Sequence, residues 1–263
     1  MAPIIHCVRH AQGYHNLSVA NHSMPDPSLT PYGEEQCRQL AKTFPYHDSV
    51  GLLVSSPLRR TIYTTLYSFT PEIERGVPII ALPEFQETAD VPCDTGTDLA
   101  VLQGEMKGKP VDLSPLSEGW NNKAGRWAPT ATALEKRARE ARQWLKARPE
   151  KEIVVVTHGG FLHYFTEDWT GYKESMGKFH HLSPDPTPRL IISSGTGWAN
   201  VEYRSFMFAD EDGDNATIVE TQHSRDSRRG TEKPLTRTER MELRETAMKS
   251  RKEIGYQPIQ AKV

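Results

Sequence analysis

Residues 4–16, IIHCVRHAQGYHN, predict a buried strand that ends in a cluster of cationic and nucleophilic side chains. The run from Ile4 to Val8 is short and mostly apolar, which is typical of a strand covered on both faces of a sheet. Arg9 and His10 follow it directly, and His15 comes next as either a pocket residue or a solvated loop residue. Ligands of open α/β sheets bind beyond the carboxyl ends of the strands, so this exit is a candidate site.

Two further segments also contain an apolar run that ends in polar residues. They are VGLLVSSPLRR at residues 50–60 and EIVVVTHGGFLHYF at residues 152–165. Apolar residues at helical spacing occur at residues 31–44, 59–69 and 132–148. Strands that alternate with helices predict an α/β fold, a three-layer sandwich whose central, mostly parallel sheet has helices on both faces.

The ends of the three predicted strands carry polar groups of a matching kind. Two arginines and two histidines that met at one point would form a strong site for a cluster of anionic oxygens. Guanidinium forks match the geometry of phosphate, and a neutral imidazole can act as a nucleophile or a donor. The polar residues at the three exits are Arg9 and His10, then Ser55, Ser56, Arg59 and Arg60, and finally Thr157 and His158.

Motifs of other phosphate, metal and hydrolase sites are absent from the sequence. There is no GxxxxGK[ST] loop, so side chains rather than a glycine loop would hold a phosphate. There is no HExxH motif, no carboxylate stands at ligand spacing beside His10 or His158, and the arginines would repel a divalent cation. The GxSxG turn of serine hydrolases is also missing. We therefore expect neither a metal site nor a cofactor.

Composition restricts the class of partner. The chain of 263 residues has a net charge of -2, which gives no electrostatic drive toward nucleic acid or an anionic membrane. No apolar run approaches the roughly 18 residues of a membrane span, and no basic and apolar leader precedes the first strand. Cys7, Cys37 and Cys93 are far apart, which indicates free thiols in a reducing compartment. We expect a cytoplasmic protein, with the nucleus as an additional location left open, whose partner is a small molecule.

Three motifs resemble the catalytic signature of the histidine phosphatase superfamily, the phosphoglycerate-mutase-like fold. VRHAQGYHN at residues 8–16 resembles its first motif, SSPLRRTIYT at 55–64 its second and VVVTHGG at 154–160 its third. Their order, spacing and strand context agree, and the resemblance covers about residues 3–205. The form RHAQGxHN followed by LTPxG is most similar to the eukaryotic phosphoglycerate-mutase-like branch.

The resemblance implies a role for each of the principal polar residues. His10 would be the nucleophile and would become phosphohistidine. Arg9 and Arg60 would bind the transferred phosphoryl group, Arg60 being the arginine that fits the pattern Ser-Pro-Leu-x-Arg. His158 would donate to the same oxygens, and Asn16 would add a further phosphate contact. These roles agree with the chemistry, because phosphoryl transfer depends mainly on positioning and charge stabilisation.

A proton donor to the leaving oxygen is also required. VPIIALPEF at residues 77–85 is a further apolar run, and the stretch LPEFQETADVPCDTG at its end offers Glu84, Glu87 and Asp94. The related stretch of the family places an acidic residue two positions after an apolar one and a Cys-Asp pair a few residues later. Phe85, Glu87 and the pair Cys93–Asp94 match this pattern, so the resemblance favours Glu87 as the acid, with Glu84 as the alternative.

We expect one catalytic domain at residues 1–223, followed by a charged helix or tail at residues 224–263. Residues 90–130 are rich in proline, glycine and polar residues without a clear period, so we expect an insertion that forms a lid. RLIISSGTGWANVEYR at 189–204 and NATIVETQH at 215–223 predict a closing hairpin. The tail has few apolar residues and an excess of lysine and arginine, which predicts a surface segment outside the core.

Together these patterns predict a metal-independent phosphomonoester hydrolase that acts on a small phosphorylated metabolite through phosphohistidine at His10. A phosphomutase of the phosphoglycerate type is the alternative within enzymes. A non-catalytic protein that binds a phosphorylated ligand is the alternative outside them, although every expected catalytic group is present. The insertion would hold a second anionic group of a substrate poorly, which favours the hydrolase; its cations are only Lys107, Lys109, Lys123 and Arg126.

Overall fold

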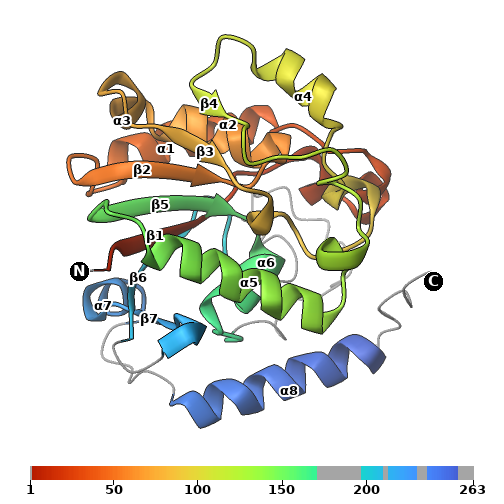
Figure 1. The fold of residues 1–263 in the computed structure, drawn as a ribbon, viewed down its shortest axis with the longest axis vertical. Coiled ribbons are helices and arrows are strands. Elements are labelled where there is room, and N and C mark those ends of the chain that lie inside the picture. Colours follow the sequence, from red (N-terminus) through yellow and green to blue (C-terminus); the bar gives the residue numbers. More distant parts are fainter. Residues whose placement is uncertain (1, 171–196, 210–212, 230–235, 254–263) are drawn as a thin grey trace, which may run out of the picture.

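A computed structural model describes residues 2–170, 197–209, 213–229 and 236–253. Its centre is a sheet in the order β4-β3-β2-β5-β1-β6-β7 (Figure 1). Strands β1, β2, β3, β4 and β5 run parallel to one another. The two remaining strands are antiparallel to their neighbours, β6 to β1 and β7 to β6. The strands are β1 (Ile4–Arg9), β2 (Val50–Ser55), β3 (Ile79–Ala81), β4 (Val111–Asp112), β5 (Glu152–Thr157), β6 (Tyr203–Phe208) and β7 (Ile218–Glu220).

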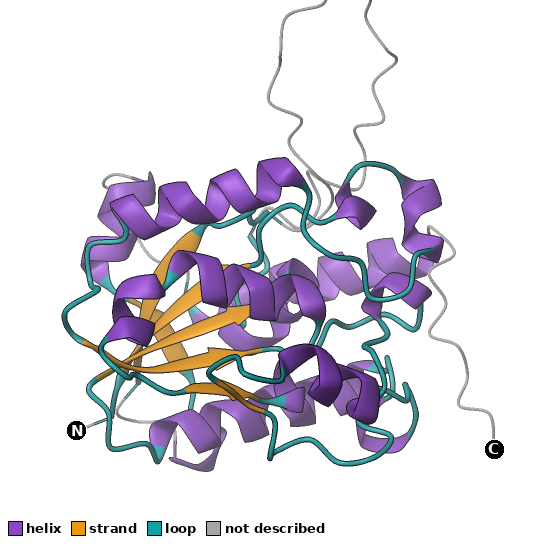
Figure 2. Cartoon of the chain, turned by 90° about the horizontal axis from the view of Figure 1, so that it is seen from above, coloured by secondary structure: helices purple, strands orange, loops and turns teal. Residues whose placement is uncertain are grey.

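Helices cover both faces of this sheet, which confirms the predicted three-layer α/β sandwich (Figure 2). On one face Ile5 and Cys7 of β1 pack with α5 (Ala131–Lys146) and α6 (Gly159–Thr166). On the other face Val8 of β1 packs in one cluster with residues of α1 and with Phe69, which follows α2. Successive strand residues point to opposite faces, so a strand that is apolar throughout needs helices on both sides. The helices on the second face are α1 (Pro31–Thr43), α2 (Arg59–Ser68) and α3 (Thr70–Glu74).

The segment 90–130 is folded onto the edge of the sheet beside β3. It contains α4 (Leu99–Met106), and β4 extends the sheet by pairing in parallel with β3. Leu102 and Trp120, both 0% exposed, form a small apolar cluster with Leu58 and Ile62 around α2. Short 3-10 turns lie at Tyr14–Asn16, Val19–Ser23, Pro83–Phe85, Pro92–Asp94, Gly125–Trp127 and Gly213–Asn215.

The predicted hairpin is present as the antiparallel pair β6–β7. Of the predicted run 189–204, residues 189–196 lie outside the described residues, and the described strand begins only at Tyr203. The expected boundary at residue 224 falls within α7 (Gln222–Arg229), whose Ser224 hydroxyl accepts a hydrogen bond from the backbone N–H of Ser205 in β6 at 3.0 Å.

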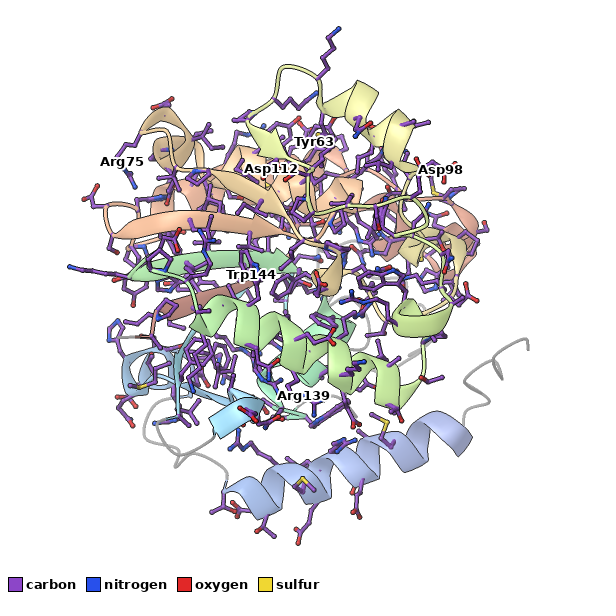
Figure 3. All side chains as sticks on the ribbon, viewed as in Figure 1. Tyr63, Arg75, Asp98, Asp112, Arg139 and Trp144 are labelled. Atoms are coloured by element: carbon purple, nitrogen blue, oxygen red, sulfur yellow. The ribbon has the colours of Figure 1, made fainter. Side chains whose placement is uncertain are left out.

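The last described helix, α8 (Arg237–Glu253), packs on the rest of the described chain, whereas the sequence predicted a surface segment outside the core. Ala247 is only 2% exposed and belongs to the main apolar cluster, and the Tyr164 hydroxyl lies 3.9 Å from the sulfur of Met248. Figure 3 shows α8 beside α5, with Arg139 of α5 between the two helices. The sequence concealed this contact because only two small or flexible apolar residues, Ala247 and Met248, carry it. No helix in the described ranges is both long and apolar enough to cross a membrane.

Candidate active site

The register of the three central strands brings the predicted site residues to one edge of the sheet. β1 and β2 flank β5, and Arg9 of β1 pairs with Thr157 of β5. The backbone continues this ladder past the strand ends, because the N–H of His10 donates to the carbonyl of Thr157 at 2.9 Å. The N–H of Ser56 donates in the same way to the carbonyl of Val156 at 2.9 Å. The positions after β1, β2 and β5 are therefore neighbours, as parallel pairing requires.

His10 is held as a neutral imidazole with one nitrogen available for reaction. Its ring is 2% exposed, and Nδ1 lies 2.7 Å from the carbonyl oxygen of Ala11. A carbonyl can only accept, so Nδ1 donates and the lone pair is on Nε2. Burial, together with the guanidinium groups of Arg60 and Arg9, holds the pKa of His10 well below its usual value. Nε2 is therefore unprotonated at neutral pH.

His158 lies directly beside His10, with ring centroids 5.2 Å apart. Its Nε2 is 2.8 Å from the hydroxyl oxygen of Ser56, so the residue after β2 orients the residue after β5. The other nitrogen, Nδ1, is buried and has no hydrogen-bond partner in the described part of the chain. Burial and the nearby Arg60 also hold the pKa of His158 well below its usual value. A buried polar atom without a partner marks a place where a ligand can supply the missing bond.

Two buried guanidinium groups complete the positive side of the site. Arg9 and Arg60 are 3% and 0% exposed, and burial lowers the pKa of Arg9 to about 10. Arg60 Nε is buried and lacks a partner among the described residues. Arg59 points elsewhere, since its Nε donates to Glu105 of α4 at 2.7 Å. Because burying a guanidinium without its full set of acceptors is costly, the pocket is suited to an oxyanion.

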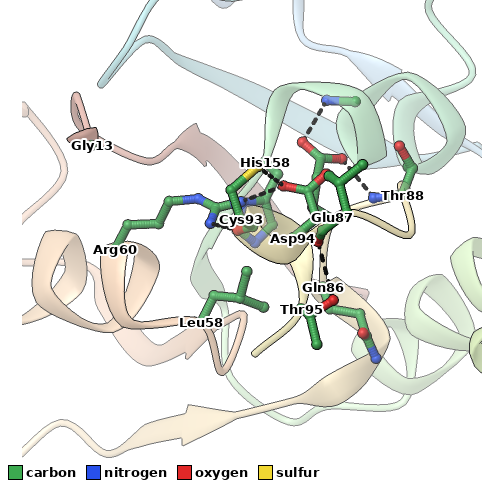
Figure 4. A network of polar contacts seen from close by, with 12 residues as sticks. Gly13, Leu58, Arg60, Gln86, Glu87, Thr88, Cys93, Asp94, Thr95 and His158 are labelled. Carbon is green, nitrogen blue, oxygen red and sulfur yellow. Dashed lines mark hydrogen bonds and ion pairs between the residues drawn. The ribbon is translucent and has the colours of Figure 1, made fainter. Parts of the chain in front are cut away.

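Glu87 lies against the turn that follows β5, whereas Glu84 points away from it. One carboxylate oxygen of Glu87 accepts from the backbone N–H of Gly160 at 3.2 Å and the other from its neighbour Thr88 at 2.9 Å (Figure 4). A Cβ at Gly160 would stand 2.5 Å from a Glu87 oxygen, so only glycine permits this approach. Glu84 instead pairs with Arg126 at 2.8 Å.

The loop after β1 turns a third histidine toward the site. His15 is 7% exposed, and its ring centroid is 5.3 Å from that of His10, so it is buried beside His10 and is not a solvated loop residue. A Cβ at Gly13 would lie 2.8 Å from His15 Nδ1, which explains why glycine precedes this turn. Asn16 accepts from the N–H of Gly13 at 3.0 Å and thereby closes the loop. No contact among the described residues joins Asn16 to Arg9 or Arg60, so its predicted phosphate contact stays a prediction.

The comparison of the whole sequence with known families is decisive. The sequence profile of the histidine phosphatase superfamily (branch 1) matches residues 5–202. The chain belongs to the histidine phosphatase superfamily. Two curated relatives come from Arabidopsis thaliana. A phosphoglycerate mutase-like protein is 28% identical over 244 residues, covering 78% of this chain and 84% of the relative. Phosphoglycerate mutase-like protein 1 is 30% identical over 198 residues, covering 60% and 68%.

A solved structure agrees with the fold of this chain. The ecdysone phosphate phosphatase of Bombix mori, solved in complex with tungstate, superposes with a TM-score of 0.51. Its sequence is 12% identical, and the match covers 89% of this chain and 98% of the silkworm protein. At this identity the likeness concerns the fold alone.

Among the described residues, no three histidine, cysteine, aspartate or glutamate side chains are grouped so that they could hold a metal ion.

Two further cations contact the backbone of Gln86 and Glu87 and were not predicted as part of the site. Lys123 Nζ donates to the Glu87 carbonyl at 3.0 Å and to the Gln86 side-chain oxygen at 3.0 Å. Arg137 of α5 donates to the Gln86 carbonyl at 2.8 Å. The signal for Arg137 is its place between Leu134 and Ala141 on the apolar stripe of α5, where an exposed arginine is not expected. Nothing local distinguishes Lys123 from the other cations of the insertion.

Proposed function

We propose that this histidine phosphatase hydrolyses phosphomonoesters of small metabolites through a phosphohistidine at His10, without a metal ion. The observation that carries the proposal is the state of His10. A neutral imidazole whose Nδ1 is locked to a carbonyl presents a nucleophilic Nε2 beside two buried arginines. Such a group is suited to attack a phosphoryl phosphorus while the arginines hold its oxygens.

The proposed reaction has two displacements. In the first, His10 Nε2 bonds to phosphorus, the ester P–O bond breaks, and Glu87 gives its proton to the departing alkoxide. In the second, water bonds to phosphorus, Glu87 takes a proton from that water, and the P–N bond breaks to restore neutral His10. Arg9 and Arg60 neutralise the charge on the non-bridging oxygens. His158, whose Nδ1 has no partner in the described residues, adds a hydrogen bond to the same oxygens.

Two cations of the insertion, Lys109 and Arg126, are already bonded to groups of the protein. This favours hydrolysis over transfer of the phosphoryl group between two positions of one substrate. Lys109 donates to the carbonyl of Glu105 at 2.5 Å, and Arg126 bonds to Glu84 at 2.8 Å and to Glu140 at 3.0 Å. A mutase must retain its dephosphorylated intermediate, which usually requires cations that grip a second anionic group. The curated relatives are named phosphoglycerate mutase-like and the silkworm structure is a phosphatase, so their names leave both reactions to be tested.

The test is hydrolysis of p-nitrophenyl phosphate by purified wild type and by His10→Ala. We expect the variant to lose essentially all activity, since no other described group is placed to accept the phosphoryl group. Wild type mixed with substrate and quenched in alkali should carry one phosphoryl group on the peptide that contains His10, detected by mass spectrometry. EDTA should leave the rate unchanged, and vanadate should inhibit.

Three results would overturn parts of this proposal. Activity of His10→Ala near that of wild type would show that the reaction does not pass through a phosphohistidine at His10. Loss of activity in EDTA, restored by a divalent ion, would show that catalysis depends on a metal ion. Rapid interconversion of 2- and 3-phosphoglycerate with little release of inorganic phosphate would make the enzyme a mutase.

A further inference from the structure

We propose that Asp94 is a positioning residue that fixes the orientation of the Arg60 guanidinium and takes up a proton when a phosphate-like dianion binds there. The inference rests on the proposed phosphoryl-binding role of Arg60. Asp94 was a candidate proton donor in the sequence, and the reaction proposed above leaves it without a role. Asp94 is 8% exposed, and its carboxylate lies 3.0 Å from Arg60 Nη2, in the network drawn in Figure 4.

The contacts of Arg60 divide its guanidinium into two edges. Nη1 donates to the carbonyl oxygen of Cys93 at 2.5 Å and Nη2 donates to the Asp94 carboxylate at 3.0 Å. These two bonds occupy the end of the fork. The side edge, formed by Nε and the second hydrogen of Nη2, remains, and Nε is buried with no partner among the described residues. A guanidinium binds two phosphate oxygens along such an edge, so the Cys93–Asp94 pair turns the unused edge toward the anion.

Asp94 is held firmly enough to act in this way. It closes a 3-10 turn at Pro92–Asp94, and the carbonyl of Pro92 accepts from the backbone N–H of Asp26 at 3.3 Å. Asp26 in turn accepts from the N–H of Arg59, the first residue of α2, at 3.0 Å. The turn that carries Asp94 and the helix that carries Arg60 are therefore also joined through Asp26, by two hydrogen bonds that are separate from the ion pair.

The charges around Asp94 make its protonation sensitive to an anion. Burial and the negative charge of Glu87 raise the pKa of Asp94, while Arg60 and Lys123 act in the opposite direction. Cys93 lies 3.6 Å away and stays a neutral thiol, because burial raises its pKa to about 12. A dianion on the side edge of Arg60 adds negative charge near Asp94 and raises the pKa of its carboxyl further. Binding then draws a proton onto Asp94 wherever the pH lies between the free and the bound pKa.

The test uses tungstate, a phosphate-like dianion that binds without turnover, and calorimetry in two buffers of different ionisation enthalpy. Wild type should take up protons on binding, and its affinity should fall as the pH rises. Asp94→Asn keeps an oxygen for Arg60 Nη2 but cannot ionise, so it should take up fewer protons. It should bind tungstate about tenfold more tightly than wild type at the alkaline end of the range and equally at the acidic end. Asp94→Ala, which loses the oxygen, should lower kcat by about 10- to 100-fold, and Asp94→Asn should restore most of it.

The matched control is Glu105→Gln, which removes the carboxylate that pairs with Arg59, one residue along the same helix. It should leave both the proton uptake and the affinity at wild-type values. Equal affinity and equal proton uptake in Asp94→Asn and wild type at every pH would contradict the inference. If Asp94→Asn does not fold, carbon-13 NMR of the wild-type Asp94 carboxyl with and without tungstate decides, and an unchanged protonation state would contradict it. Failure of wild type to bind tungstate would instead count against the proposed function.

Discussion

At the scale of single residues, Glu84 and Glu87 are the two candidates for the proton donor. They are only three residues apart, but their side chains have different partners. Both side chains follow β3 in the same acidic stretch, but Glu84 is paired with Arg126 and Glu87 meets the N–H groups of Gly160 and Thr88. Only Glu87 touches the turn that follows His158. We therefore keep Glu87, and not Glu84, as the proposed proton donor.

Replacing Glu87 by glutamine should damage catalysis in proportion to how much the leaving group needs a proton. Loss of a general acid costs about 100- to 10,000-fold for a poor leaving group and much less for a good one. We expect Glu87→Gln to reduce kcat/KM strongly for alkyl phosphates and only mildly for p-nitrophenyl phosphate, while Glu84→Gln stays close to wild type for both. Steady-state kinetics on the two substrates measure this, and the reverse pattern in the two variants would assign the acid to Glu84.

At the scale of elements, one buried carboxylate joins the start of α2 to the start of the insertion. Asp26 is 2% exposed and has a left-handed backbone with φ of 38°. One of its oxygens accepts from the N–H of Arg59 at 3.0 Å, and the other accepts from the N–H and hydroxyl of Thr97 at 3.0 and 2.8 Å. The residue before α2, Leu58, provides no side-chain cap, so Asp26 supplies the negative charge that a helix N-terminus favours.

Asp26→Ala should destabilise the protein because it leaves three partly buried donors, the N–H of Arg59 and the N–H and hydroxyl of Thr97, without an acceptor. We expect the free energy of unfolding to fall by about 3 kcal/mol, measured by urea denaturation. The turn at Pro92–Asp94 should also loosen, which hydrogen exchange of residues 92–97 would detect. Asp48→Ala, at an exposed aspartate, is the control and should change the stability by less than about 0.5 kcal/mol. A loss in Asp26→Ala no greater than that of the control would show that the clamp contributes little.

At the scale of the whole molecule, α8 is part of the folded domain and not a separate tail. Its buried contacts are small, Ala247 and Met248 against the cluster that includes Tyr164, but Arg244 also pairs with Glu135 of α5. Between the two helices lies a cavity of about 160 Å³ lined mainly by charged side chains. The helix therefore contacts α6 through Tyr164 and Met248 and contacts α5 through the Arg244–Glu135 pair.

Ala247→Asp should undock α8 because it buries a charge with no partner in the apolar cluster. We expect a loss of about 3 kcal/mol, limited by the free energy of undocking, and a fall in Tm of roughly 5 to 10 °C. Leu243→Asp introduces the same residue at a position that is 37% exposed, and it should lower the Tm far less. Both can be measured by differential scanning calorimetry. Truncation before Thr236 should match Ala247→Asp, and an unchanged Tm after truncation would show that the helix contributes no stability.

Local patterns in the sequence predicted the strands β1, β2 and β5, the helices α1, α2 and α5, and the grouping of the polar residues that follow those strands. The apolar runs that become β1, β2 and β5 each end in polar residues, and the apolar stripe of α5 has helical spacing. Strands buried on both faces require a parallel sheet between helices, and parallel strands place their carboxyl ends together. The grouping of His10, Arg60 and His158 follows from these local rules, because it depends only on strand order and direction.

Tertiary packing alone decided the remaining features. The resemblance already favoured Glu87, but only the fold shows its contact with Gly160, more than seventy residues away in the chain, where the missing Cβ leaves room for a carboxylate. Which edge of Arg60 is left for a ligand depends on Asp94 of the insertion, and the docking of α8 depends on Ala247, Met248 and the Arg244–Glu135 pair. Each of these contacts joins segments distant in sequence and leaves no periodicity in either of them, so only the folded chain reveals it.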